Sequence, residues 1–251
     1  MLSAIELRLL RRISPREPAC CSGSRYNSQS KLSVLLGDDF LRRAAGKTII
    51  DFGCGEGVEA IELARHGARR VIGIDIREEV LQAARQKVRQ AAVEDICQFT
   101  TRTNEVADII VSIDGFEHYS DPAGMLRNMH TLLKPDGEVL VSFGPVWYHP
   151  LGGHLFSVFP WAHILFSEEA LMRWRAGFKA DGATRFSEVA GGLNQMTIKK
   201  FERLIRESPF RLVVLELVPI QGLRHFQNRL TREFTTASVR CRLVTRAPTG
   251  A

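Results

Sequence analysis

The sequence contains few cysteines, and their spacing excludes the usual cross-linked architectures. Its five cysteines form an odd set with no C-x-x-C pair and no zinc-ribbon spacing. A disulfide framework or a structural zinc site of that kind is therefore not expected, and a reducing, cytoplasmic compartment fits best. The composition, 45% hydrophobic and 25% charged, is that of a globular protein and excludes a disordered tail.

Charged residues are absent from the 29 residues 139–167. This stretch resembles a membrane span in its lack of charge, but it holds three prolines and three glycines, which would interrupt a helix repeatedly. Its apolar core, Leu155 to Phe166, has about half the length that a span needs. We therefore do not expect it to cross a membrane.

The N-terminus lacks the long apolar run of a secretory signal and contains Glu6 and Glu17 among its arginines. We expect residues 1–30 to form a loosely attached leader, with a surface helix as one form of it. Residues 31–251 are expected to form a single domain.

Positive charge is concentrated at the C-terminal end. The formal net charge is +6, and residues 199–251 hold 11 basic against 4 acidic residues. A surface for nucleic acid, anionic lipid or a phosphorylated substrate could have this composition, and so could solvated arginines on helix and strand faces. The last interpretation is the preferred one.

Short apolar runs alternate with amphipathic helical stretches from Gly46 onwards. The first run, 47–52, is followed by a glycine loop and a helix, and the second, 70–75, by the helix 78–92. Strands separated by helices imply a parallel sheet. We predict an α/β fold with a doubly wound, Rossmann-like, seven-stranded sheet, an antiparallel last strand and helices on both faces, and an inserted lid over residues 144–195.

The glycine loop Asp51-Phe-Gly-Cys-Gly-Glu-Gly57 is the strongest chemical signal. Glycines let a backbone approach a ligand closely, and Asp75 follows Gly57 by 18 residues at the tip of the next predicted strand. An acid at that place can accept hydrogen bonds from the two hydroxyls of a ribose. The dinucleotide pattern would need a third glycine where Val58 stands, and Glu56 would oppose a pyrophosphate.

These residues resemble the class I S-adenosylmethionine (SAM) methyltransferases, specifically the broad type 11 group. The resemblance covers about residues 46–145 and includes the turn Leu132-Leu-Lys-Pro-Asp-Gly137. It implies SAM as the cofactor and does not identify the substrate. The cofactor residues that it implies are Asp51, Gly53, Gly55, Gly57, Asp75, Ile76, Ser112 and Ile113.

A second cluster of polar residues follows the fourth predicted strand. Asp114, Glu117 and His118 would share a face if this segment began a helical turn, and such a set suits Mg²⁺, Mn²⁺ or Zn²⁺. The spacing is similar to the Glu-x-x-Glu-His of the ubiquinone-pathway O-methyltransferases and the small-RNA 2′-O-methyltransferases. In those subgroups a later histidine completes a metal site, and we select His163 for that position. The alternative is the role seen in type 11 members without metal, where the Glu orders the loop.

The uncharged segment contains His149, His154 and His163 among several aromatic residues, as expected for a substrate lid. A buried arm that packs on the core is the alternative. A third role is shallow insertion of the run Leu155 to Trp161 into a membrane surface beside the C-terminal arginines. Either His118 or His149 could act as a general base near neutral pH.

The leading functional hypothesis is a SAM-dependent methyltransferase that acts on an oxygen of a small, fairly apolar molecule. A divalent metal at Asp114, Glu117, His118 and His163 could assist by binding adjacent substrate oxygens. Two alternatives stay open: an RNA 2′-O-methyltransferase, and a SAM-binding protein without transfer activity. No RNA-binding module is recognisable, so nucleic acid is not the expected partner. The sequence does not address the oligomeric state.

Overall fold

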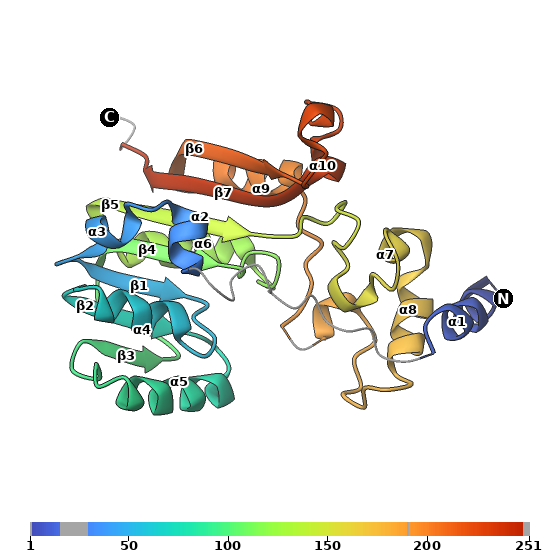
Figure 1. The fold of residues 1–251 in the computed structure, drawn as a ribbon, viewed down its shortest axis with the longest axis horizontal. Coiled ribbons are helices and arrows are strands. Elements are labelled where there is room, and N and C mark those ends of the chain that lie inside the picture. Colours follow the sequence, from blue (N-terminus) through green and yellow to red (C-terminus); the bar gives the residue numbers. More distant parts are fainter. Residues whose placement is uncertain (1, 16–29, 190, 248–251) are drawn as a thin grey trace.

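The computed structural model describes residues 2–15, 30–189 and 191–247. Its centre is a seven-stranded sheet with the strand order β3-β2-β1-β4-β5-β7-β6 (Figure 1). Five strands are parallel, and β7 runs antiparallel to both β5 and β6, as predicted. The strands are β1 (Thr48–Phe52), β2 (Arg70–Ile74), β3 (Cys97–Thr100), β4 (Ala107–Ile113), β5 (Leu133–Phe143), β6 (Phe210–Pro219) and β7 (Thr236–Thr245).

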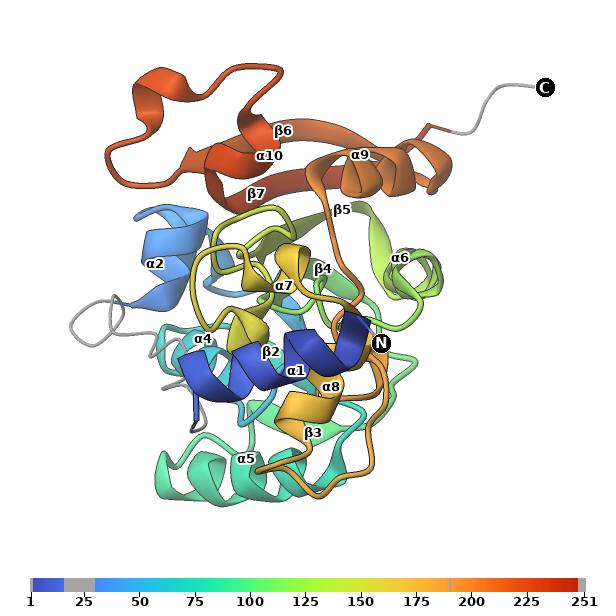
Figure 2. The ribbon, with the colours of Figure 1, turned by 90° about the vertical axis from the view of Figure 1, so that its right-hand side faces the viewer.

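Helices cover both faces of this sheet (Figure 2). Buried residues of α2 to α5 pack on one face and those of α6 and α9 on the other. The helices are α1 (Leu2–Ile13), α2 (Lys31–Leu36), α3 (Phe40–Ala44), α4 (Val58–Arg65), α5 (Glu78–Gln90), α6 (Pro122–Thr131), α7 (Ala162–Leu165), α8 (Glu168–Arg175), α9 (Ile198–Glu207) and α10 (Arg232–Thr235). The doubly wound prediction is confirmed.

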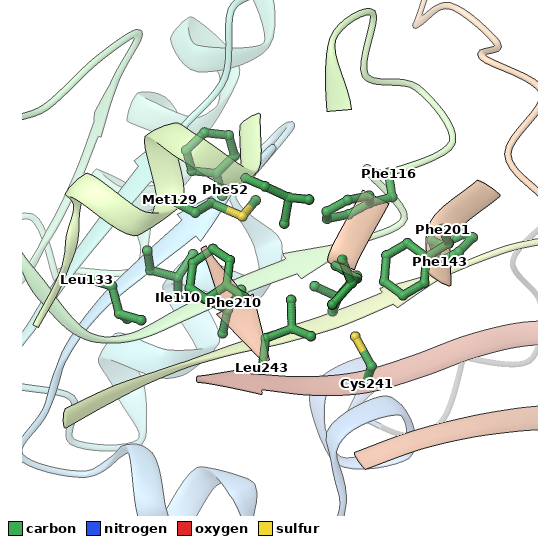
Figure 3. Packing of buried hydrophobic residues seen from close by; sticks show 14 of the residues in the cluster. Phe52, Ile110, Phe116, Met129, Leu133, Phe143, Phe201, Phe210, Cys241 and Leu243 are labelled. Carbon is green, nitrogen blue, oxygen red and sulfur yellow. The ribbon is translucent and has the colours of Figure 1, made fainter. Parts of the chain in front are cut away.

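The alternation of side chains along each strand creates the two cores. In β1, Ile49 packs with the α2 to α5 helices and Ile50 with α6 and α9, because successive strand residues point to opposite faces. The second of these cores has a row of aromatic rings at its centre (Figure 3). Phe201 lies 4.9 Å from Phe143 and 5.3 Å from Phe116 between ring centroids. Phe116 thereby fixes the loop that follows β4.

Residues 144–197 connect β5 to α9 and include the predicted lid. They form a third buried cluster together with α1, and this unit lies beyond the carboxyl ends of the parallel strands (Figure 1). Phe156 is fully buried in it. The lid is therefore a small packed layer with its own core.

Helix α1 is attached more firmly than expected for a loose leader. Its Leu7 and Leu10 are buried with the residues of α8. The indole Nε1 of Trp174 donates a hydrogen bond to the carbonyl of Ser14 at 2.8 Å. The expectation of loose attachment is thus wrong for residues 2–15, because their amphipathic pattern finds an apolar partner in the lid. Residues 16–29 lie outside the described part of the chain.

Among the described residues, no helix combines the length and apolar character needed to traverse a bilayer. The uncharged stretch 139–167 is divided between the end of β5, irregular turns and the short helix α7.

Replacing Leu10 by Ala should release α1. Leu10 is fully buried, so its truncation should cost about 2–4 kcal/mol of local stability, whereas Leu9→Ala on the same helix should cost little because Leu9 is 48% exposed. Hydrogen exchange of the α1 amides measures this difference. Equal protection in both variants would show that α1 does not depend on this contact.

Candidate functional site

The glycine loop after β1 has the backbone conformation that the sequence requires. Gly53, Gly55 and Gly57 have φ values of 86°, 50° and 75°, which L-residues rarely adopt. A Cβ at Gly57 would lie 2.3 Å from Phe99 Cζ, whereas one at Gly55 would meet nothing within 4 Å. Gly57 therefore permits close packing of helix on strand, and Gly55 leaves an open face where a ligand can approach the backbone.

Asp75 lies at the end of β2, as its spacing predicted, and is hydrogen-bonded to the glycine loop. Its Oδ2 accepts a hydrogen bond from the Gly55 amide at 3.0 Å, and Gly53 and Cys54 donate to the carbonyl of Ile74. The carboxylate at the end of β2 and the loop after β1 thus form one continuous surface. Ile76, next to the acid, is 87% exposed and free to contact a planar ring.

Arg77 binds the Asp75 carboxylate in this structure. Its Nε lies 3.1 Å from Oδ1 and its Nη2 lies 3.1 Å from Oδ2. Burial of Asp75 opposes ionisation, but hydrogen bonds from Arg77 and from Gly55 lower the pKa of the carboxyl below its usual value. The Arg77 side chain is 49% exposed and that of Asp75 only 6%, so the arginine is the partner with room to move.

Asp51 is a buried acid with an unused oxygen. The residue is 3% exposed, and its Oδ2 has no hydrogen-bond partner among the described residues. Burial, with the nearby charge of Glu59, raises the pKa of Asp51 well above its ordinary value, and Lys31 counteracts this only in part. A cationic ligand above the loop would relieve the cost of that buried charge, so the residues present fit the ammonium and sulfonium groups of SAM.

Tyr119 joins the loop after β1 to the loop after β4. Its hydroxyl donates to the carbonyl of Phe52 at 2.9 Å and lies 2.8 Å from Ser112 Oγ. Ser112 is fully buried, and its side chain is engaged by Tyr119. Ile113 is 7% exposed. Sequence reasoning missed Tyr119, because a tyrosine seven residues beyond a strand serine carries no spacing signal of its own.

Asp114 does not join the predicted metal cluster. Its φ of 50° interrupts the helical turn that would have aligned it with Glu117 and His118. Its carboxylate instead binds Lys31 Nζ at 2.7 Å, and Lys31 also approaches Glu59 at 3.4 Å. Asp114 therefore drops out of the predicted ligand set. Its ion pair with Lys31 links the loop after β4 to α2 instead.

Glu117, His118 and His154 are the residues that the structure brings together. Their potential ligand atoms all lie within 4.8 Å of one another. Glu117 Oε1 accepts the Gly144 amide at 3.2 Å, whereas Glu117 Oε2 and His154 Nε2 are buried without a partner in the described chain. Burial, with repulsion from Asp114, raises the pKa of Glu117 to about 8, and burial beside His118 lowers the pKa of His154 to about 4.

The lid orients His118 and the loop that carries it. His118 Nδ1 lies 2.7 Å from the carbonyl of Gly192, so Nδ1 carries the proton and Nε2 keeps its lone pair. Asn194 Nδ2 donates to the carbonyls of Phe116 and Tyr119 at 2.6 and 2.8 Å. These contacts fix the tautomer and orientation of the His118 ring and hold the backbone of its loop.

His163 and His149 have other partners than the sequence suggested. His163 Nε2 donates to the Trp147 carbonyl at 2.7 Å, and its Nδ1 lies 3.0 Å from Ser157 Oγ. Both of its nitrogens are thus engaged, and the histidine that joins the cluster is His154. His149 Nδ1 accepts the Leu151 amide at 2.9 Å. That contact uses the acceptor nitrogen of the neutral ring, so His149 does not offer a lone pair for base catalysis.

Comparison with known proteins identifies the family of the chain. A family model described as a methyltransferase domain matches residues 27–215. The chain belongs to this family. The family resemblance inferred from the glycine loop and Asp75 is thereby confirmed.

Relatives share part of the methyltransferase. The ubiquinone biosynthesis O-methyltransferase of Neisseria meningitidis serogroup C is 38% identical over 104 residues, which are 39% of this chain and 44% of that protein. The match thus spans less than half of that relative. The magnesium protoporphyrin IX methyltransferase of Synechocystis PCC 6803, solved with S-adenosylhomocysteine (SAH) bound, is 18% identical at a TM-score of 0.54, covering 98% of this chain and 96% of that one. The cyclase SpnF has a TM-score of 0.57 at 14% identity over 98% and 96% of the chains, so the fold occurs with more than one chemistry.

The methyltransferase should tolerate alanine at Gly46 better than at Gly57. Both glycines have positive φ, 71° and 75°, but only at Gly57 would a Cβ collide with Phe99. Gly46→Ala should cost about 1–2 kcal/mol of unfolding free energy from backbone strain alone. Gly57→Ala should cost roughly 1–3 kcal/mol more because the core must rearrange. Denaturant titration compares them, and equal losses would contradict the packing role of Gly57.

Binding of SAH should depend on Asp75 and not on Arg77. Asp75→Asn removes a charged acceptor for ribose hydroxyls, so affinity should fall about 10- to 100-fold. Arg77→Ala frees the carboxylate and should bind SAH at least as tightly as the parent protein. Calorimetric titration measures both. Equal loss in the two variants would mean that the Asp75–Arg77 pair belongs to the bound state.

Proposed function

We propose that this protein transfers a methyl group from SAM to an oxygen of a small, relatively apolar molecule, with help from a divalent cation. The observation that carries the proposal is the convergence of Glu117, His118 and His154 beside the cofactor loop. The name of the Neisseria relative, an O-methyltransferase, supports the reaction type.

The cofactor residues have separate roles in this proposal. Bound SAM would supply a methyl group on a cationic sulfur, which needs alignment more than activation. Asp75 would hold the ribose, and Asp51 would balance the positive charge of the ligand. Gly55 would allow the backbone to approach it. Tyr119 would keep the cofactor loop and the loop of Glu117 at a constant separation.

The acceptor's proton is the remaining chemical problem. A divalent cation at Glu117, His118 and His154 would act as a Lewis acid that favours deprotonation of a bound hydroxyl. The donor set fits such an ion, because one carboxylate oxygen and one imidazole nitrogen are buried and unpartnered, and His118 presents Nε2. Without an ion, His118 Nε2 would be the general base.

A small apolar acceptor is supported over RNA by the pairing of the C-terminal arginines. Arg232 forms two bonds with Glu202 at 2.6 Å each, and Arg242 lies 3.4 Å from Glu138. Arg246 donates to the carbonyls of Phe210 and Arg206 at 2.8 and 2.9 Å. Much of the basic charge near the C-terminus therefore stabilises β6, β7 and α9. The uncharged part of the lid, residues 144–167, lies beyond the carboxyl ends of the parallel strands instead (Figure 1).

Metal titration of the metal-stripped protein tests the ligand set. Mn²⁺ should bind the parent protein, and Glu117→Gln or His154→Asn should weaken binding at least about 10-fold because a ligand atom is removed. Asp114→Asn and His163→Asn serve as matched controls and should retain binding, since neither residue belongs to the cluster. Loss of binding in His163→Asn but not in His154→Asn would overturn the assignment.

Turnover measurements test the reaction. With vicinal diphenols as acceptors, the metal-loaded protein should form the mono-O-methyl product, and chelation should lower the rate at least about 10-fold. A rate that is unaffected by chelation but abolished by His118→Asn would mean that His118 acts as a general base and that no metal takes part. Binding of SAH without transfer to any hydroxyl acceptor would contradict the proposed function.

A further inference from the structure

Exposed apolar side chains gather at one end of the protein. Of the fifteen large hydrophobic residues that are exposed in the described chain, ten belong to three segments: α1, the lid turn 151–165, and the connection 220–235 between β6 and β7. These segments are far apart in the sequence, yet all lie at the carboxyl ends of the parallel strands (Figures 1 and 2). This end also holds the glycine loop and the metal cluster.

Helix α1 has two apolar faces, only one of which is covered. Leu7 and Leu10 contact α8, whereas Ile5, Leu9 and Ile13 are 62%, 48% and 46% exposed. Because the latter three follow each other at intervals of four, they form one stripe along the helix. A monomer in water has no packing reason to keep that stripe.

The other two segments also project apolar groups outward. In the lid, Trp161 is 38% and Leu165 is 65% exposed. In the 220–235 connection, Phe226 is 66% and Leu230 is 89% exposed. Leu230 is the most exposed large hydrophobic residue in the described chain, so this loop presents its apolar side chains directly to solvent.

Positive charge accompanies these groups, and the single acids of α1 and of the 220–235 connection are engaged by other residues. Exposed arginines flank the apolar residues: Arg8, Arg11 and Arg12 in α1, and Arg224 and Arg229 in the connection. Within the described part of the chain, none of the five forms an ion pair with an acid. Glu6 accepts from the Ser167 hydroxyl, and buried Glu233 accepts the amides of Ile198 and Lys199, each at 2.9 Å.

We propose that this end of the protein, formed by α1, the lid turn and the 220–235 connection, docks on an anionic lipid bilayer. Apolar side chains that project from three separate segments, with arginines between them, match a membrane surface, where the chains enter the headgroup region and the guanidinium groups bind phosphates. The surface differs from the run Leu155 to Trp161 predicted from sequence, because Phe156 is buried and the β7 arginines Arg240 and Arg242 pair with Glu216 and Glu138.

Docking in this orientation would turn the lid and the site toward the lipid. An acceptor that partitions into the bilayer would then reach the lid without crossing water, a consequence that rests on the proposed methyl transfer. The docking itself does not rest on it, so vesicle binding and turnover can fail independently.

Vesicle sedimentation of the full chain tests the proposal. Phosphatidylcholine vesicles with phosphatidylglycerol should bind the protein at least about 10-fold more tightly than phosphatidylcholine alone, and added salt should weaken the binding. The double variants Ile5→Ser/Leu9→Ser and Phe226→Ser/Leu230→Ser should each lower the affinity about 10-fold or more. So should Arg8→Gln/Arg12→Gln.

Matched controls distinguish this surface from general stickiness. Val106→Ser/Leu212→Ser changes two exposed apolar residues outside the three segments, and Arg65→Gln/Arg89→Gln changes two exposed arginines on α4 and α5. Both should bind vesicles like the parent protein. Equal losses in test and control variants would overturn the proposal, as would the absence of binding to anionic vesicles at low salt.

Two further outcomes would assign the surface to another partner. Concentration-dependent dimerisation that the Ile5/Leu9 variant abolishes, without vesicle binding, would mean that a second copy covers α1. Salt-sensitive RNA binding lost in Arg8→Gln/Arg12→Gln, without vesicle binding, would do the same for nucleic acid. In the supporting case, anionic vesicles shift the fluorescence of Trp161 to shorter wavelength, and Trp161→Phe removes the shift.

Discussion

The parallel pairing of β1 with β2 and β4 is the constraint on which the rest of the site depends. It brings the carboxyl ends of three strands to one edge, so the glycine loop, Asp75 and the Glu117 loop become neighbours although they are distant in sequence. Two hydrogen bonds consolidate this arrangement: Gly55 to Asp75, and Tyr119 to Phe52. Both link the ends of adjacent strands.

The lid adds the second level of organisation. It has its own buried cluster with α1, and it returns to the sheet through residues 192–194. There the Gly192 carbonyl orients His118, and Asn194 holds the loop backbone on either side of Glu117. His154 also comes from the lid. The proposed metal centre is therefore shared between the sheet and the lid, so movement of the lid would change the ligand geometry and the shape of the acceptor site together.

Burial changes the protonation of the unpartnered polar groups at the site. Burial raises the pKa of Glu117 and lowers that of His154, which favours the neutral form of each in the absence of a ligand. Burial likewise raises the pKa of Asp51. Buried polar atoms without partners are costly, and they are expected where a ligand would bind them. Here Asp51 Oδ2 is one such atom, and Glu117 Oε2 and His154 Nε2 are two others. Packing of Phe116 against Phe201 anchors the start of the loop that carries Glu117.

The sequence by itself determined the class of fold, the glycine loop and the acid at the end of the second strand. Those features are local: glycine spacing, strand and helix periodicity, and an acid at a strand end. Only the tertiary structure decided the rest. His154 rather than His163 completes the cluster. The irregular turns of the lid, with left-handed backbone at His154 and Trp161, decide this, and residue spacing does not reveal it. Asp114 pairs with Lys31 because its left-handed backbone directs it away from Glu117 and His118. Helix α1 packs on α8, about 160 residues away, because both present apolar faces.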